Sequence, residues 1–284
     1  MVRLSVEDPR DLSVPIMKPG VRNLADNLFR ILANNPSVMT LDGTNTYLYQ
    51  DRISGKATVV DPGPTLMEHH DLILRLVHDL GSDVAQVLLT HGHPDHSALA
   101  DDLAAELSSP LIRSTEAGSS PSAMRRLEDA GISVIPTPGH SSDSISYRTR
   151  EAVLLTGDHL LGRGTTVILH PDGSLGSYLS SLRRIEELEF KILAPGHGPE
   201  MAEDLARKVI IYYTDHRLER IEQIEKLLEE GVRLVSEVVD RLYGSMSHPL
   251  LAWSARASTM ATLTYLAELG RVTLSSDSIA LNEI

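Results

Sequence analysis

Apolar and polar positions in the first third of the chain follow two different spacings. Residues Asn45–Gln50 alternate after an Asp-Gly turn, and the stretch GKATVVDPG contains a second short apolar run that ends at Asp61. Two such runs joined by turn residues predict antiparallel strands. Over residues 66–80 the apolar positions recur at helical spacing instead, and Gly81 follows them. This segment therefore predicts a helix that ends near Gly81.

Beyond Gly81 the pattern alternates between strand-like and helix-like segments. The predicted strands cover residues 84–90, 110–114, 133–136, 144–148, 152–156 and 191–194, and the predicted helices cover residues 96–107, 123–130 and 178–188. Hairpins and strand–helix units within one segment indicate α/β layers with the helices on the outside. The first 15 or so residues show neither spacing and are expected to form an irregular lead.

The composition changes near residue 200, and we predict a boundary there between a domain of residues 1–200 and a module of residues 201–284. Helices are predicted over residues 202–230, 234–243 and 255–269, followed by a terminal hairpin within residues 270–284, an order that resembles a winged-helix module. This module has nine Lys or Arg against thirteen Asp or Glu, whereas a DNA-binding domain needs a basic face. We therefore expect it to serve packing or a substrate channel rather than to bind duplex DNA.

Net charge and cysteine content narrow the function further. The chain of 284 residues carries a net charge of −13, which repels nucleic-acid phosphates at long range. It contains no cysteine, so any metal site must use His and Asp. No apolar run approaches the roughly 18 residues of a membrane span, and the N-terminal stretch lacks the apolar segment of a secretory signal. These features predict a cytoplasmic protein without a membrane span, and they indicate no particular oligomeric state.

The stretch LLTHGHPDH, residues 88–96, places three histidines and one aspartate directly after a predicted strand. His91 and His93 are two positions apart in extended chain, so their side chains point to the same side. Asp95 and His96 lie on the following turn beside them. Because imidazole and carboxylate are ligands that zinc accepts, this spacing predicts a shared metal site.

Three later stretches repeat this local arrangement. TPGHSSDS contains His140, LLTGDHLL contains Asp158 and LAPGHGP contains His197. Each of these residues follows a predicted strand, with a glycine in the turn or beside it. Strand ends at one edge of a sheet can converge, and such edges are common ligand sites in α/β proteins. The four stretches together predict one metal centre.

In this order, THGHPDH, TPGHSSDS, TGDHLL and APGHGP resemble the motifs of the metallo-β-lactamase superfamily over about residues 22–200. The stretches NPSVMTLDGTNTYLY, VVDPGP and LLGRGTTVI and the helical tail are similar to the β-lactamase-like-protein-2 branch. That branch includes endoribonucleases that act on single-stranded RNA, and close relatives act as thioesterases. The resemblance implies an αββα sandwich, an α/β fold with the metals at one sheet edge, and a small winged-helix-like C-terminal module.

The resemblance also implies a set of ligands for two divalent ions, expected to be zinc. The first ion is assigned to His91, His93 and His140, the second to Asp95, His96 and His197, and Asp158 is assigned as the bridge. Two such ions lie about 3.5–4 Å apart and share a bridging water.

Two zinc ions lower the pKa of that water and provide a metal-bound hydroxide, and they also polarise the oxygen under attack. Asp95 is expected to be catalytic as well as a ligand, because it can orient the hydroxide or relay a proton. Our first hypothesis is hydrolysis of an ester or thioester-type bond in a small molecule. The alternatives are a metal-dependent endoribonuclease acting on short single-stranded RNA and a non-enzymatic regulatory module.

Further residues near these motifs are possible substrate contacts. His159 follows Asp158 directly, and Thr165 and Thr166 lie in the long loop LLGRGTTVILHPDG. For all three, packing within the protein is the alternative interpretation. The remaining helical histidines are expected to be solvated, and they are His69, His70, His78 and His216.

Overall fold

The computed structural model describes residues 17–282, so the predicted irregular lead lies mostly outside the described residues. Its chain forms two compact units that are interleaved in sequence. The first unit contains residues 17–136, 143–165 and 189–206, and the second contains residues 137–142, 166–188 and 207–282. Among the described helices, none is long and apolar enough to cross a membrane.

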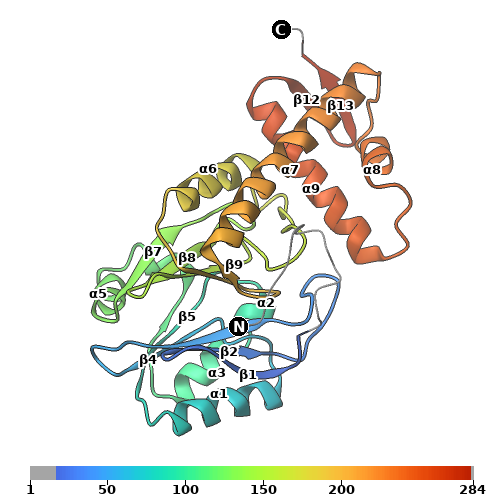
Figure 1. Cartoon of the computed structure of the whole chain (residues 1–284). Coiled ribbons are helices and arrows are strands. Elements are labelled where there is room, and N and C mark those ends of the chain that lie inside the picture. The colour runs from blue at the N-terminus through green and yellow to red at the C-terminus, as the bar shows by residue number, and fades with distance from the viewer. Residues whose placement is uncertain (1–16, 283–284) are drawn as a thin grey trace. The chain divides into compact units, whose positions relative to one another are not determined.

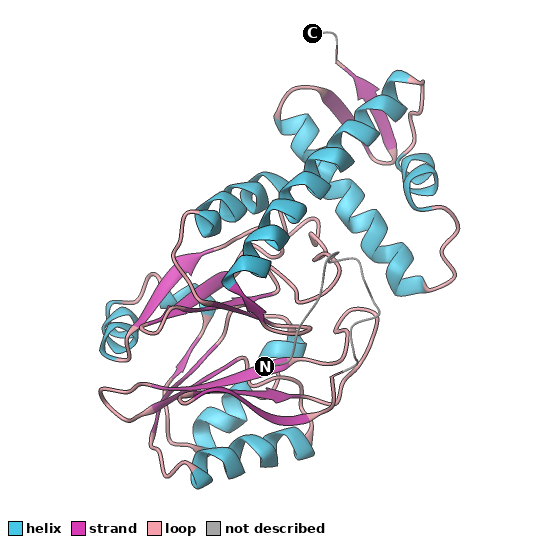
Figure 2. Cartoon of the chain, in the orientation of Figure 1, coloured by secondary structure: helices cyan, strands magenta, loops and turns pink. Residues whose placement is uncertain are grey.

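The first unit contains two sheets (Figure 2). The first sheet has the order β1-β2-β3-β4-β5-β6, with antiparallel pairs up to β4 and parallel pairs beyond it. Its strands are β1 (Gly20–Ala25), β2 (Leu28–Leu32), β3 (Asn45–Gln50), β4 (Ala57–Val60), β5 (Val84–Leu88) and β6 (Leu111–Ile112). The predicted antiparallel pair of β3 and β4 is therefore confirmed.

The second sheet has the order β11-β10-β9-β8-β7, in which only the β9–β10 pair is parallel. Its strands are β7 (Ile132–Pro136), β8 (Ile145–Thr149), β9 (Val153–Gly157), β10 (Ile192–Pro195) and β11 (Met201–Ala202). The helices of the first unit are α1 (Met67–Asp79), α2 (Pro94–Ser97), α3 (Ala100–Glu106), α4 (Ser114–Ala117) and α5 (Pro121–Asp129). These elements form a mixed α/β fold of sheets and helices.

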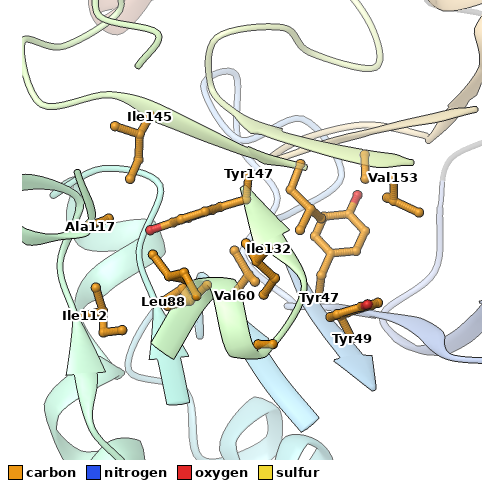
Figure 3. Packing of buried hydrophobic residues seen from close by; sticks show 14 of the residues in the cluster. Tyr47, Tyr49, Val60, Leu88, Ile112, Ala117, Ile132, Ile145, Tyr147 and Val153 are labelled. Carbon is orange, nitrogen blue, oxygen red and sulfur yellow. The ribbon is translucent and has the colours of Figure 1, made fainter. Parts of the chain in front are cut away.

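Apolar side chains from both sheets pack together in one core (Figure 3). Leu88 and Val60 of the first sheet and Tyr147 of the second belong to this cluster, and the Tyr147 hydroxyl donates to the Leu89 carbonyl at 2.9 Å. A second cluster covers the opposite face of the first sheet, where α1 and α3 lie (Figure 1). The central strands of the first sheet are thus buried on both faces, which fixes the strand ends that carry the candidate ligands.

The sequence pattern did not predict β1 and β2, and burial on both faces explains this for β2. All five residues of β2 are buried. Leu28 faces the core between the sheets, whereas Phe29 and Ile31 face the cluster beside α1 and α3. A strand covered on both sides carries apolar residues on both faces, as Leu28 and Phe29 show here, so the alternation that marks a half-buried strand is absent.

The predicted helix over residues 96–107 is wrong in one respect, because two helices occupy this region. Helix α2 ends at Ser97, and α3 begins at Ala100. Between them the Leu99 amide donates to the Gly63 carbonyl at 3.2 Å, a contact to the turn after β4. The predicted strand over residues 110–114 is also shorter than expected, since it covers only Leu111–Ile112 and Ser114 begins α4.

The second unit is largely helical. It contains α6 (Leu175–Glu186), most of α7 (Glu203–Glu229), α8 (Val235–Tyr243) and α9 (Pro249–Glu268). Its hairpin, predicted within residues 270–284, is confirmed as β12 (Val272–Ser275) and β13 (Ser278–Leu281). Helix α9 begins at Pro249, ahead of the predicted start at residue 255, because proline fits the first turn of a helix.

Candidate metal centre

The candidate ligands of the first unit all follow the ends of strands. The segment 89–96, which includes the start of α2, follows β5, Asp158 follows β9, and His197 lies two residues beyond β10. Strands β9 and β10 are parallel neighbours, so the residues after them leave the same edge of the second sheet. The sequence places these side chains at strand ends, and the fold brings those ends to one place.

Four ligand atoms from these loops lie close together. The Asp158 Oδ1 atom is 3.3 Å from the His96 Nε2 atom and 3.3 Å from the His197 Nε2 atom. The Asp95 Oδ2 atom is 3.2 Å from His197 Nε2 and 3.7 Å from His96 Nε2. Among the described residues of this unit, two groups have ligand atoms within 4.8 Å of one another: Asp95 with His96 and His197, and His91 with His96 and Asp158.

In His96 and His197 the second ring nitrogen, Nδ1, donates a hydrogen bond within the protein. His96 Nδ1 lies 2.9 Å from the Asp61 carboxylate, and His197 Nδ1 lies 3.1 Å from the Gly43 carbonyl. A carboxylate and a carbonyl only accept hydrogen bonds, so both Nδ1 atoms must donate. In the neutral rings the lone pairs therefore sit on the two Nε2 atoms, which are 3.3 Å apart. Two facing lone pairs repel each other, and a cation between them removes the conflict.

Burial and charge act in opposite directions on these groups. Burial lowers the pKa of His197, but the neighbouring carboxylates of Asp158 and Asp95 outweigh it and raise the pKa to about 9. Burial raises the pKa of Asp158, yet His197 and His96 hold it well below its ordinary value. Carboxylates therefore dominate the electrostatics of this cluster, as expected for a site that holds cations.

Asp61 organises this cluster, although its role was not predicted. Its Oδ1 accepts from the Thr90 amide and its Oδ2 from the Thr90 hydroxyl, both at 2.7 Å. Because the hydroxyl proton of Thr90 is used in this way, its oxygen accepts from His91 Nδ1 at 3.0 Å. Asp61 thus fixes the tautomer of His96 directly and that of His91 through Thr90. The only signal in the sequence was its position at the end of a strand before a Pro-Gly turn.

The His197 loop is fastened to β3. The side-chain amide of Asn45 donates to the carbonyls of Pro195 and Gly198 at 2.9 and 2.8 Å. The Tyr47 hydroxyl donates to the Pro195 carbonyl at 2.9 Å. The loop also needs glycine at position 196, since a Cβ atom there would lie 2.6 Å from the Asp158 Oδ1 atom. Polar residues of β3 therefore set the position of His197.

His93 and His140 are the two remaining histidines of the predicted ligand set. His93 is half-buried and immediately precedes α2, and its ring centroid is 4.5 Å from that of His91. His140 belongs to the second unit, where it is buried and its Nδ1 donates to the Val167 carbonyl at 2.6 Å. That bond places the lone pair of the neutral His140 ring on Nε2, as in His96 and His197.

The predicted substrate contacts differ in exposure. His159 is buried, and its amide donates to the Thr156 carbonyl at 3.0 Å. Thr165 is half-buried, and Thr166 is buried with its hydroxyl 3.2 Å from His140 Nδ1. The expectation that His69 is solvated is wrong. It is 2% exposed, and its Nε2 lies 2.8 Å from the Thr46 hydroxyl.

Comparison with known proteins gives consistent matches. The family described as the metallo-beta-lactamase superfamily matches residues 39–123 and 125–197. The beta-lactamase-like protein 2 homolog of Caenorhabditis elegans is 29% identical, over 84% of this chain and 82% of that protein. An atrochrysone carboxyl ACP thioesterase of Aspergillus chevalieri is 30% identical, over 80% and 77%. The solved structure of a beta-lactamase domain protein from Burkholderia ambifaria covers 94% of this chain and 95% of its own, with a TM-score of 0.75 at 20% identity.

Proposed function

Because the chain belongs to the metallo-beta-lactamase superfamily and is a metal-dependent hydrolase, we propose that it binds two zinc ions and cleaves an ester or thioester bond in a small molecule. The observation that carries the proposed metal site is the pair of Nε2 atoms of His96 and His197. They face each other at 3.3 Å while both Nδ1 atoms are held as donors. The donor set of imidazoles and carboxylates fits zinc.

The ligands are proposed as follows. His91, His93 and His140 would hold one ion, Asp95, His96 and His197 would hold the other, and Asp158 would contribute to both. The ligand atom of Asp158 lies within 4.8 Å of those of His91 and His96, which belong to different proposed sets, and this supports its place between them. Bound ions of this kind supply Lewis acidity and lower the pKa of coordinated water towards neutrality.

Asp95 is proposed to act on the proton as well as on the ion. Its side chain is 29% exposed, against 12% for Asp158, so it is the more open of the two carboxylates. One oxygen, Oδ2, lies with the ligand nitrogens of His96 and His197. The same carboxylate therefore combines a ligand atom with access for water, and it is suited to accept a proton from the attacking water.

A thioester is the proposed substrate class for two reasons. The relative from Aspergillus chevalieri carries the name of an acyl-carrier thioesterase, and it matches most of both chains. The net charge of −13 favours a small substrate over a polyanion such as RNA. His159, Thr165 and Thr166 are retained as proposed contacts to such a substrate.

We propose that residues 1–200 form the catalytic domain and that residues 201–284 form a winged-helix-like module. The order of α8, α9 and the β12–β13 hairpin supports this description of the module. Val235 at the start of α8 donates its amide to the Asp277 carbonyl between the two strands, which fastens the helix to the hairpin at 2.9 Å. The acidic balance of the module favours a structural role over binding of duplex DNA.

A direct assay tests the proposal. The full chain is supplied with zinc, its bound metal is quantified, and it is incubated with a panel of acyl thioesters and with a short single-stranded RNA. We expect two zinc ions per chain, thioester hydrolysis and intact RNA. One ion or fewer would refute the two-ion site, and cleavage of the RNA without thioester hydrolysis would refute the substrate class.

A further inference from the structure

Arg217 is a buried cation on helix α7, outside the residues that the family match covers. It is 6% exposed, and its guanidinium carbon lies 5.3 Å from the centre of the Tyr178 ring. Among the residues that the structure describes, no carboxylate forms an ion pair with Arg217, and its Nε atom has no hydrogen-bond partner. Burying such a charge is costly, so the contacts that Arg217 does make require an explanation.

The hydrogen bond of Arg217 goes to the backbone of a loop. Its Nη2 atom donates to the carbonyl oxygen of Thr166. The guanidinium is planar and rigid, so a ring on its face and a carbonyl at its edge fix the Thr166 peptide in position and orientation. Arg217, Tyr178 and Thr166 all belong to the second unit, so this contact lies within one compact body.

The same loop holds His140 from several sides. The Val167 carbonyl, one residue beyond the Arg217 contact, accepts from His140 Nδ1 at 2.6 Å. The Thr166 hydroxyl lies 3.2 Å from the same Nδ1 atom, and the Leu169 amide donates to the His140 carbonyl at 3.2 Å. Gly173 packs against this backbone, since a Cβ atom there would lie 2.5 Å from the His140 carbonyl oxygen. The ring and the backbone of His140 therefore depend on the position of this loop.

We infer that Arg217 is a positioning residue for the metal centre: by holding the Thr166 peptide it keeps the Val167 carbonyl on His140 Nδ1, so that the ring presents Nε2 as its ligand atom. This inference rests on the proposed role of His140 as a zinc ligand. Helix α7 would then contribute to the metal centre, because its residue Arg217 holds the loop that contains Thr166 and Val167.

Helix α7 offers a matched control. Arg220 lies three positions further along the same helix, and its guanidinium carbon lies 4.6 Å from the centre of the Tyr243 ring. Like Arg217, Arg220 makes a cation–π contact, but with a different ring. Within the described residues, none of its interactions involves residues 166–173. Methionine at either position keeps a long apolar stem and removes the charge and the donors.

The test measures zinc binding by the full chain after metal removal, with bound zinc quantified at a series of free zinc concentrations. In Arg217→Met we expect affinity for one of the two ions to fall about tenfold, as for loss of an outer-shell support. Arg220→Met should bind both ions as the unaltered chain does. Arg217→Lys keeps the charge and a donor but lacks the planar fork, and should be weaker by only about threefold.

The nitrogen NMR spectrum of the imidazoles provides a second readout, in which the His140 signal is identified by its loss in His140→Ala. The unaltered chain should show the Nδ1-protonated tautomer, and Arg217→Met a mixture of tautomers. Unchanged zinc affinity in a folded Arg217→Met variant, or an equal loss in Arg220→Met, would overturn the inference. If Arg217→Met does not fold, unchanged affinity in Arg217→Lys overturns it. If His140 is not a zinc ligand, His140→Ala keeps both ions. This result distinguishes failure of the proposed ligand role of His140 from failure of the inference about Arg217.

Discussion

Replacement of Asp61 by asparagine tests whether ring orientation controls metal affinity. The two side chains have nearly the same shape, so packing around position 61 is preserved. The backbone φ of Asp61 is 52°, a left-handed conformation that asparagine tolerates well. The substitution therefore changes the hydrogen-bonding character of the site and leaves its geometry intact.

The size of the effect follows from the three hydrogen bonds that Asp61 accepts. An amide has a single oxygen, whereas the carboxylate accepts from the Thr90 amide on one oxygen and from the Thr90 hydroxyl and His96 Nδ1 on the other. With its oxygen on the Thr90 amide, the new NH₂ group faces His96 Nδ1. The ring must then accept there and carry its proton on Nε2, which cannot ligate a metal.

We expect the affinity for the ion assigned to His96 to fall about 10- to 100-fold, the usual range for loss of the partner that orients a ligand, with a smaller loss through Thr90 at the ion assigned to His91. That range corresponds to roughly 1.4–2.7 kcal/mol of binding free energy. Zinc titration of the metal-depleted full chain measures it directly.

Asp51→Asn is the matched control for Asp61→Asn. Asp51 is also a buried aspartate, it follows β3 of the same sheet, and its Oδ2 accepts from the Ser54 amide at 2.8 Å. This substitution should lower the free energy of unfolding without changing zinc affinity. If Asp61→Asn binds both ions as the unaltered chain does, or loses no more affinity than Asp51→Asn, the reasoning about ring orientation is wrong.

Three further predictions concern single residues. Asp158→Ala should keep its fold by circular dichroism, lose one zinc ion and lose activity by orders of magnitude; normal turnover would show that Asp158 is misassigned. Asp95→Asn, assayed at saturating zinc, should lower kcat far more than it raises KM, and full turnover under excess zinc would limit Asp95 to a ligand role. Burial lowers the pKa of His69 from 6.5 to about 4, so between these pH values the unfolded chain binds a proton that the folded chain does not. The folded state is therefore favoured above pH 6.5 and loses this stability as the pH falls towards 4. The free energy of unfolding is measured at pH 7 and pH 5 with chelator present, and its decrease should be smaller in His69→Gln than in the unaltered chain by about 2 kcal/mol. In His78→Gln, on the exposed side of the same helix, the decrease should match that of the unaltered chain.

The sequence predicted that the candidate ligands follow strand ends, because this signal is local. A scarce residue type recurs after strand ends, and the turn glycines lie next to it in the chain. Parallel pairing of β9 with β10 then brings Asp158 and His197 to one edge. The pattern also predicted the helical C-terminal region and its final hairpin, where amphipathic spacing and turn residues agree.

Contacts between distant segments could not be predicted in the same way. Asn45 reaches the His197 loop across 150 residues of sequence, and Asp61 reaches His96 across 35. An asparagine at the start of a strand has no feature that indicates such a partner. His69 was misjudged for a different reason, because its spacing from Leu72 and Ile73 already puts it on the apolar face of its helix. Only the partner of its ring, Thr46 in a neighbouring strand, had no local signal.

The motifs determine where the imidazole rings lie, whereas the fold determines which ring nitrogen is available to a metal. The motifs supply imidazoles, but a neutral imidazole binds a metal through only one nitrogen, and the partner of the other nitrogen selects which. For His197 and His140 that partner is a backbone carbonyl, of Gly43 and Val167, which no side-chain substitution removes. For His96 it is the Asp61 carboxylate, which a substitution can remove. Loss of orientation at His96 therefore follows from a change at its acceptor, whereas at His140 it requires displacement of the loop that Arg217 holds.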